Sequence, residues 1–319
     1  MLDAPSRSAA LVVGGGTMGA DVAMVLARAG CKTIVLETTE ARRMLLPDYF
    51  ARGMTDLGVP NRIGLLSTGA SLDDVPWSEI DLVIECIPER LDLKRALFAE
   101  LVRRARPDAL LASNSSSFPI SAIAEDLDTA PRMLGLHFFM PAHLVPLVEV
   151  ILGKASNPSH ADRLVAFMRG CGMMPVRVRK DLPGFLANRL QHALAREAFS
   201  MIDEGVATAE DVDKAVRFGF GFRFLAAGPV LQRDHAGIEI HTAAAATMYP
   251  SLSAATVPAK VLRDKVAAGK LGMKTGEGFF RWTQESIAAE RKRYDDLLRA
   301  GLKLIAAELP PIAADDTNP

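Results

Sequence analysis

The 319-residue sequence has few cysteines, no excess charge of either sign and no long apolar run. Its three cysteines, Cys31, Cys86 and Cys171, lie far apart without C-x-x-C spacing, which argues against a disulfide framework and against a thiolate metal site. The 37 Lys and Arg residues balance 38 Asp and Glu residues, for a net charge of -1. The chain therefore has no basic field that would hold nucleic acid or an anionic membrane.

No apolar stretch approaches the length of a membrane-spanning helix. The first apolar run, near the start of the sequence, is too short for a secretion signal and leads at once into glycines. We therefore expect a cytoplasmic protein, because reducing conditions suit three unpaired cysteines. Internal repeats and low-complexity tracts are absent from the sequence.

Two patterns divide the chain, as its length also suggests. Up to about residue 180, short apolar runs alternate with amphipathic stretches of helical period, which is typical of a mostly parallel sheet covered on both faces. From Asn188 onward the patterns are long and helical. The sequence thus predicts an α/β domain over residues 1–184 and an all-α domain over residues 185–319.

A glycine-rich turn joins the first predicted strand to the first predicted helix. Gly14, Gly16 and Gly19 form G-x-G-x-x-G, in which the first glycine permits a tight turn, the second admits a pyrophosphate and the third lets helix and strand pack closely. The following helix N-terminus favours anions. This predicts a Rossmann-type dinucleotide site, with Thr17 and Met18 as further candidate cofactor contacts; a glycine turn without a ligand is the alternative.

An acidic residue ends the second predicted strand. Glu37 lies 18 residues after Gly19, at the position where a carboxylate accepts hydrogen bonds from the adenosine ribose. Such a carboxylate repels a 2′-phosphate, so NAD is favoured over NADP. Arg42 and Arg43 lie close by and weaken this preference.

A histidine and a glutamate interrupt two later apolar runs. If those runs pair as neighbouring strands, His137 and Glu149, 12 residues apart, meet at the carboxyl edge of the sheet, where α/β folds bind ligands. A carboxylate that accepts from one ring nitrogen raises the basicity of the other, as a general base requires. The alternative is a core histidine beside a structural glutamate.

Ser113 to Ser117, and Asn188, either cap helices or orient a substrate oxygen.

The chain resembles the L-3-hydroxyacyl-CoA dehydrogenases along nearly its whole length. The resemblance rests on motifs that occur together in the family order: GGGTMG, DLVIECIPERLDLK, ASNSSS, GLHFFMP with LVEV, KDLPGFLANRL, AAGPVLQRDHAG and GMKTGEGFF. It implies an NAD-binding domain, a helical dimerisation domain, an active site in the cleft between them, a homodimer and a place in fatty acid metabolism.

The resemblance also implies a reaction and its residues. NAD oxidises the 3-hydroxyl of an L-3-hydroxyacyl-CoA to a ketone, reversibly, with His137 as general base and Glu149 as its orienting carboxylate. Ser116 and Asn188 correspond to the groups that hold the substrate oxygen. Glu37, Glu89 and Lys94 correspond to cofactor-binding residues of the family. We add Cys86 and Asn114 as further candidate cofactor contacts.

The sequence departs from the family pattern in two places. Met140 replaces an asparagine of H-F-F-N-P, either as drift in a turn or as a change in the substrate pocket, and we expect the nearby His143 to be an exposed loop residue. The segments AVRFGFGFRFLAAGP and RYDDLLRAGLKLI are similar to the branch of L-gulonate and L-carnitine dehydrogenases. Arg223, between aromatic residues of the first segment, either binds a free carboxylate or pairs with an acid of the helical domain. Arginines after Glu37 meet a CoA phosphate or are solvated; they are Arg42, Arg43, Arg52 and Arg62.

Other classes of protein remain as alternatives. A non-catalytic NAD-binding scaffold would keep the glycines and lose Ser116, His137, Glu149 and Asn188, all of which are present. A metal enzyme would use Asp234, His235 and His241, but the spacing is poor for one helical face and a third strong ligand is missing, so we predict no metal. Acyl-CoA and free hydroxy acid both stay open as substrates.

Overall fold

The computed structural model describes residue 2 and residues 4–313. Its contacts divide these residues into two compact units, one formed by the chain up to Asn188 with residues 306–313, the other by Arg189–Ile305. The predicted domains, 1–184 and 185–319, differ from these units at both ends of the helical part. The tail joins the first unit because the Ala313 N–H donates to the Gly170 carbonyl; residues 314–319 lie outside the described residues.

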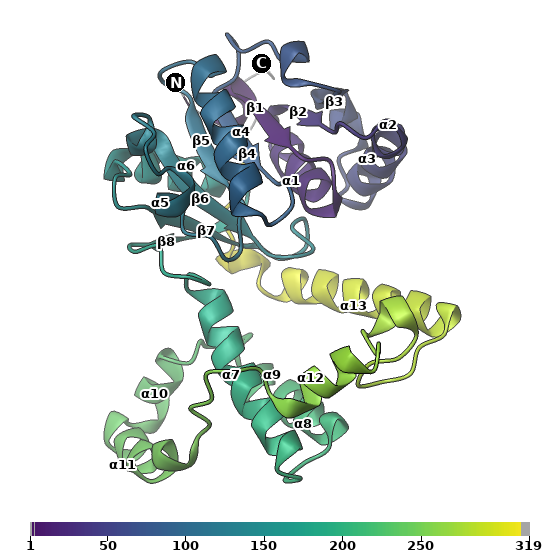
Figure 1. Ribbon diagram of the computed structural model, residues 1–319, viewed down its shortest axis with the longest axis vertical. Helices are drawn as coiled ribbons and strands as arrows, with labels where there is room; N and C mark the ends of the chain where they lie inside the picture. Colours follow the sequence, from purple (N-terminus) through teal and green to yellow (C-terminus); the bar gives the residue numbers. More distant parts are fainter. Residues whose placement is uncertain (1, 3, 314–319) are drawn as a thin grey trace. The chain divides into compact units, whose positions relative to one another are not determined.

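The first unit is built on an eight-stranded sheet in the order β3-β2-β1-β4-β5-β6-β7-β8 (Figure 1). Neighbouring strands are parallel except for β6 and β7, which are antiparallel. The prediction of a mostly parallel sheet is thus confirmed. The strands are β1 Ala9–Val13, β2 Lys32–Leu36, β3 Leu66–Gly69, β4 Leu82–Glu85, β5 Leu110–Ser113, β6 Met133–Phe138, β7 Leu147–Leu152 and β8 Met174–Val178.

Helices cover both faces of this sheet. Because side chains alternate along a strand, Val12 of β1 belongs to a core under α1, α3 and α6, whereas Leu11 belongs to a core under α4 and α5. Two apolar faces explain why the strands read as continuous apolar runs. The helices of this unit are α1 Thr17–Arg28, α2 Glu40–Arg43, α3 Leu46–Asp56, α4 Leu91–Arg104, α5 Ile120–Ile123 and α6 Pro158–Gly170.

The strand order places several polar residues at one edge of the sheet. β2 and β3 lie on one side of β1, and β4 and the later strands lie on its other side. Such a switch in strand order opens a crevice at the carboxyl ends of the strands. The glycine turn follows β1, Glu37 follows β2 and Asn114 follows β5. The fold therefore brings the predicted cofactor residues to one edge.

The second unit consists of helices, as predicted. Its long helices leave most of their large apolar side chains exposed, and Ala227 and Ile287 are the only apolar residues of this unit that the structure buries. Phe218, Val230 and Tyr249 are each more than two-thirds exposed. The helices are α7 Ala187–Asp203, which begins in the first unit, α8 Ala209–Ala215, a π-helical turn Val216–Phe220, α9 Gly221–Arg223, α10 Leu231–Ala236, α11 Ile238–Met248, α12 Lys260–Ala267 and α13 Gln284–Leu304.

Among the described residues, no helix combines the length and the apolar character that crossing a bilayer requires.

Candidate active site

The glycine turn has the geometry of a phosphate-binding loop. Gly14 has φ +109°, and a Cβ on it would lie 2.7 Å from the Cys86 carbonyl oxygen. A Cβ on Gly19 would lie 1.9 Å from the Gly14 carbonyl oxygen, so helix α1 packs against the turn only with glycine there. Above Gly16, at the N-cap of α1, the space is open. The turn therefore presents bare backbone at a helix N-terminus, as a pyrophosphate requires.

Glu37 directly follows β2, beside this turn. Its carboxylate is buried, and Oε1 accepts from the Thr39 N–H at 2.8 Å. The Arg43 guanidinium donates to the Glu37 carbonyl oxygen at 2.8 Å, so it braces the backbone here. Arg62 likewise donates to the Arg28 carbonyl oxygen. These two arginines therefore have structural partners.

A cavity of about 640 Å³ lies over the glycine turn. Helices α1 and α3 and the segment between β2 and α3 form its walls, and Arg42 and Arg52 bring two cations to it. An anion in this cavity would meet both the helix N-terminus and the arginines. The lining residues are Gly15, Gly16, Thr17, Ala20, Arg42, Leu45, Leu46, Asp48, Tyr49 and Arg52.

A buried lysine, Lys94, lies between the buried Glu85 and the partly exposed Glu89 at the end of β4. The Lys94 ammonium lies 2.7 Å from Glu85 Oε1 and 3.1 Å from Glu89 Oε2. Glu85 also accepts from the Ser113 hydroxyl at 2.6 Å and from the Ile87 N–H at 2.7 Å. A fully buried carboxylate requires such donors, because burial without them is strongly unfavourable. Glu85 thus fixes the position of Lys94.

Glu89 connects this cluster to the serine segment. Its Oε1 accepts from the Ser115 hydroxyl at 2.6 Å, and from the Ser117 hydroxyl at 2.6 Å and N–H at 2.9 Å. Partial burial raises the pKa of Glu89, but the hydrogen bonds from Ser115 and Ser117 and the Lys94 charge outweigh it and lower that pKa to about 2. Glu89 is therefore an anion at neutral pH that holds the residues on both sides of Ser116.

His137 and Glu149 face each other across β6 and β7. They are direct partners in the antiparallel register, and His137 Nδ1 lies 2.8 Å from Glu149 Oε2. Both side chains are buried. With Nδ1–H donating to the carboxylate, Nε2 is left as an acceptor, and it lies 3.1 Å from the Ser116 hydroxyl. The contact that the sequence predicted between the two residues is present.

The beginning of α7 completes the surroundings of Glu149. Glu149 Oε1 accepts from the Leu186 N–H at 3.0 Å and from the Ala187 N–H at 2.8 Å. These are N–H groups that the first turn of a helix leaves without partners, so the carboxylate caps α7 from a distant strand. Asn188, the next residue, is thereby held near the His137–Glu149 pair at the end of the first unit.

Two further cofactor candidates, Asn114 and Cys86, directly follow strands β5 and β4. Asn114 Oδ1 accepts from the Phe138 N–H at 2.8 Å and so ties the end of β5 to the residue after His137. Burial raises the pKa of the Cys86 thiol above its usual range, with Glu85 adding to the effect, so Cys86 is a neutral thiol beside the glycine turn.

Met140 and His143 lie in the first unit after β6, whereas Arg223 and His241 lie in the second unit. The Met140 side chain is 59% exposed, two residues after β6. Arg223 is exposed at the end of α9. His241, a metal candidate, lies 3.2 Å from the Arg233 guanidinium through Nδ1, an environment that disfavours a cation. The expectation of an exposed His143 is wrong: its side chain is 14% exposed, because the turn after β6 folds it against Asp21.

Sequence reasoning missed Glu85 and Asp21. Glu85 was visible as an acid inside the apolar run DLVIECI, and Asp21 as an acid on the apolar face of the first helix. Buried acids in such positions signal a polar network, but their partners come from distant segments.

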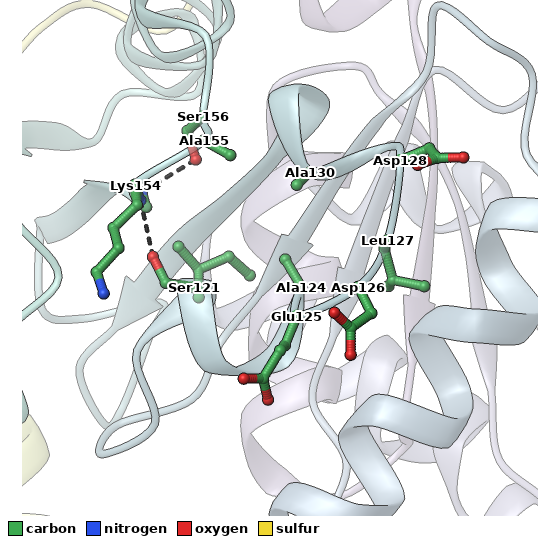
Figure 2. Close-up of a pocket in the computed structure, with 12 residues that line it drawn as sticks. Ser121, Ala124, Glu125, Asp126, Leu127, Asp128, Ala130, Lys154, Ala155 and Ser156 are labelled. Carbon is green, nitrogen blue, oxygen red and sulfur yellow. Dashed lines mark hydrogen bonds between the residues drawn. The ribbon is translucent and has the colours of Figure 1, made fainter.

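Figure 2 shows a second cavity of about 660 Å³, in the same unit. Glu125, Asp126 and Asp128 lie around it, and the Lys154 N–H donates to the Ser121 hydroxyl at 2.7 Å. None of the predicted site residues lines this cavity. It is therefore separate from the groups around His137.

The family of the chain follows from comparison with known proteins. A family described as "3-hydroxyacyl-CoA dehydrogenase, NAD binding domain" matches residues 9–182, and the C-terminal domain of the same enzymes matches residues 184–282. The chain belongs to the 3-hydroxyacyl-CoA dehydrogenase family. It is an NAD-dependent oxidoreductase of this family, in agreement with the glycine turn and Glu37.

Curated relatives of this dehydrogenase include enzymes with different substrates in their names. It is 33% identical over 293 residues to 5-formyl-3-hydroxy-2-methylpyridine 4-carboxylate 5-dehydrogenase of Mesorhizobium japonicum, covering 88% of this chain and 94% of that one. It is 33% identical over 288 residues to the mitochondrial hydroxyacyl-coenzyme A dehydrogenase of Homo sapiens, covering 85% and 90%.

Solved structures give the same two groups. The crystal structure of the pyridine carboxylate dehydrogenase superposes with a TM-score of 0.87 at 30% identity, covering 93% of this chain and 98% of that one. The (S)-3-hydroxybutyryl-CoA dehydrogenase of Ralstonia eutropha superposes with a TM-score of 0.72 at 28% identity, covering 87% and 100%.

The second and third glycines of the motif, Gly16 and Gly19, are expected to respond differently to alanine. Gly16→Ala should leave the thermal unfolding temperature near the wild-type value, because nothing lies within 4 Å of the added Cβ, yet it should abolish NADH binding by filling the space for the pyrophosphate. Gly19→Ala should lower the unfolding temperature, because its Cβ meets the Gly14 carbonyl. Melting curves and NADH fluorescence titrations measure both; tight NADH binding by Gly16→Ala would contradict this account.

Proposed function

We propose that this dehydrogenase oxidises the 3-hydroxyl of an L-3-hydroxyacyl-CoA to a ketone, with His137 as general base. The observation that carries the proposal is the position of His137 between Glu149 Oε2, at 2.8 Å, and the Ser116 hydroxyl, at 3.1 Å. A base held by a carboxylate, with a hydroxyl at its free nitrogen, has the arrangement needed to remove a proton from an alcohol.

The residues around the glycine turn fit NAD. Bare backbone at Gly14 and Gly16 would accept the pyrophosphate, with Arg42 and Arg52 across the cavity, and Glu37 would accept from the adenosine ribose hydroxyls. We place Glu89, Lys94, Cys86 and Asn114 at the nicotinamide half, since they follow β4 and β5. When bound, NAD supplies the acceptor for the hydride that leaves C3.

The proton follows a short route. In the proposed reaction His137 Nε2 takes the proton of the C3 hydroxyl, while Ser116 and Asn188 hold the oxygen. The imidazolium that forms is stabilised by Glu149, which lies in contact with Nδ1 and is itself fixed by the N-terminus of α7. In the reverse direction His137 returns the proton to the ketone. Because Glu149 is already oriented, little reorganisation accompanies proton transfer.

A second candidate substrate is a carboxylic acid without CoA. One observation favours it: the likeness to the pyridine carboxylate dehydrogenase covers nearly the whole of both chains with a TM-score of 0.87. On this alternative Arg223 would bind the carboxylate as a bidentate partner, and Met140 would adapt the pocket. His137 and Glu149 would keep their roles.

A substrate panel distinguishes the two candidates. NADH formation would be followed with NAD and, separately, L-3-hydroxybutyryl-CoA, free L-3-hydroxybutyrate, L-gulonate, L-carnitine and the pyridine aldehyde named above. We expect turnover of the CoA thioester, because the family as a whole is named for it. Turnover of a free acid alone would instead assign the second function, and Arg223→Lys should then raise KM selectively.

His137→Ala is the control for the panel. This variant should bind NADH as the wild type does, because His137 lies on β6 and not in the glycine turn after β1. Its turnover should fall by about 100-fold or more, because the general base is missing. Near-normal kcat in this variant would refute His137 as the base. If the wild-type protein binds NADH but turns over none of the five compounds, the non-catalytic scaffold is favoured instead.

We further propose that the enzyme is a homodimer formed through the helical unit. The helices between Arg189 and Ile305 expose apolar side chains such as Phe218, Val230 and Tyr249, with little core of their own. Burying one such side chain contributes about 1.5 to 3 kcal/mol, so a second copy that covers this surface would supply the missing core.

Light scattering of the purified enzyme at micromolar concentration tests this proposal. We expect a mass twice that of one chain, retained on dilution, since the helical unit would be unstable alone. A monomeric mass with a cooperative thermal transition would contradict it.

A further inference from the structure

A buried polar cluster outside the catalytic groups joins three elements around the cofactor turn. Asp21 lies on α1, Tyr49 on α3, and His143 in the segment between β6 and β7. The Tyr49 hydroxyl donates to Asp21 Oδ1 at 2.6 Å, and His143 Nδ1 lies 3.1 Å from Asp21 Oδ2. Asp21 is fully buried. The cluster therefore connects the cofactor helix to the segment that follows His137.

The contact between His143 and Asp21 is electrostatic. Nδ1 and Oδ2 are close, but their alignment does not meet hydrogen-bond geometry, and neither atom has another hydrogen-bond partner among the described residues. As an imidazolium, or as a neutral ring with Nδ1–H toward the acid, His143 presents positive potential to Oδ2. His143 therefore offsets the negative charge at Oδ2, while Tyr49 donates to Oδ1.

The place of Asp21 makes this compensation important for an anionic cofactor. Asp21 is four residues after Thr17, the first residue of α1, so it lies about 6 Å along the helix axis from the N-terminus at which a pyrophosphate would bind. An uncompensated buried charge at such a distance repels a phosphate appreciably, because the protein interior screens poorly. The positive end of the helix dipole would be weakened where the cofactor needs it.

We propose that His143 is a positioning residue that makes the buried charge of Asp21 compatible with cofactor binding. Through this pair the segment after β6 contacts α1, the helix whose N-terminus lies at the proposed cofactor site. Tyr49, which also lines the cavity over the glycine turn, holds Asp21 from the other side. NAD binding is common to both candidate reactions, so this role of His143 is the same whichever substrate is oxidised.

A double-mutant cycle tests the proposal by equilibrium NADH fluorescence titration without substrate. His143→Ala should raise the Kd for NADH about tenfold, because Asp21 then stands uncompensated near the pyrophosphate. Asp21→Asn removes the charge and should bind NADH as the wild type does. The double variant should match Asp21→Asn, since without the carboxylate there is no charge for His143 to offset.

Wild-type affinity in His143→Ala, or a double variant that binds as weakly as His143→Ala, would show that His143 does not act through Asp21. If His143→Ala does not fold, the comparison of Asp21→Asn with and without His143→Ala decides: equal Kd supports the proposal, and a further loss refutes it.

Two further variants serve as controls. His160→Ala removes another partly buried imidazole, whose Nδ1 contacts the Pro131 carbonyl at 3.0 Å, and should leave the Kd unchanged. His143→Asn keeps an N–H donor near the position of Nδ1 and should recover most of the lost affinity. A loss of affinity in His160→Ala equal to that in His143→Ala would mean that any imidazole deletion loosens the domain, and would overturn the specific role.

Discussion

The hydrogen bond between His137 Nδ1 and Glu149 Oε2 exists because one strand of the sheet runs backward. β7 is antiparallel to β6, and the register places the two residues directly opposite each other. A parallel β7 would require a long crossover and would not hold the two side chains in this register. The reversal also sends the chain on to β8 and then to the start of α7, whose N–H groups bind the other oxygen of Glu149.

The same physical constraint recurs around this edge of the sheet. Asp21, Glu85 and Glu149 are carboxylates without exposure to solvent, and each is held by partners from different segments. Tyr49 and His143 hold the first, Lys94 and Ser113 the second, and His137 with the α7 backbone the third. Since an unpaired buried carboxylate is strongly unfavourable, each one fixes the segments that supply its donors. Buried acids thus order the loops around the cofactor turn.

The sequence predicted the parts of this arrangement that depend on local pattern. The glycine turn, the alternation of strands and helices, and the approach of His137 to Glu149 follow from spacing and strand pairing. The edge strand β3, Leu66–Gly69, was not predicted, because Ser67 and Thr68 are exposed and the run is only partly apolar. The α7 contact to Glu149 spans 37 residues, so no local pattern announces it.

His143 shows the same limit for a single residue. A histidine near a proline in a turn is usually exposed, and the sequence offers no sign that Asp21, more than a hundred residues earlier, meets it. Similarly, Lys94 reads as one of several cations on an amphipathic helix, and its burial depends on how α4 docks over β4. Tertiary packing, rather than propensity, decides both positions.

The central claim is that Glu149 prepares His137 for proton transfer, and single-turnover stopped-flow measurement of NADH formation in Glu149→Gln tests it most directly. Glutamine keeps an oxygen for the α7 N–H groups but removes the charge that stabilises the imidazolium. The account predicts that the single-turnover rate falls by about 100-fold or more while the Kd for NADH stays at the wild-type value. A single-turnover rate equal to that of the wild type would contradict it.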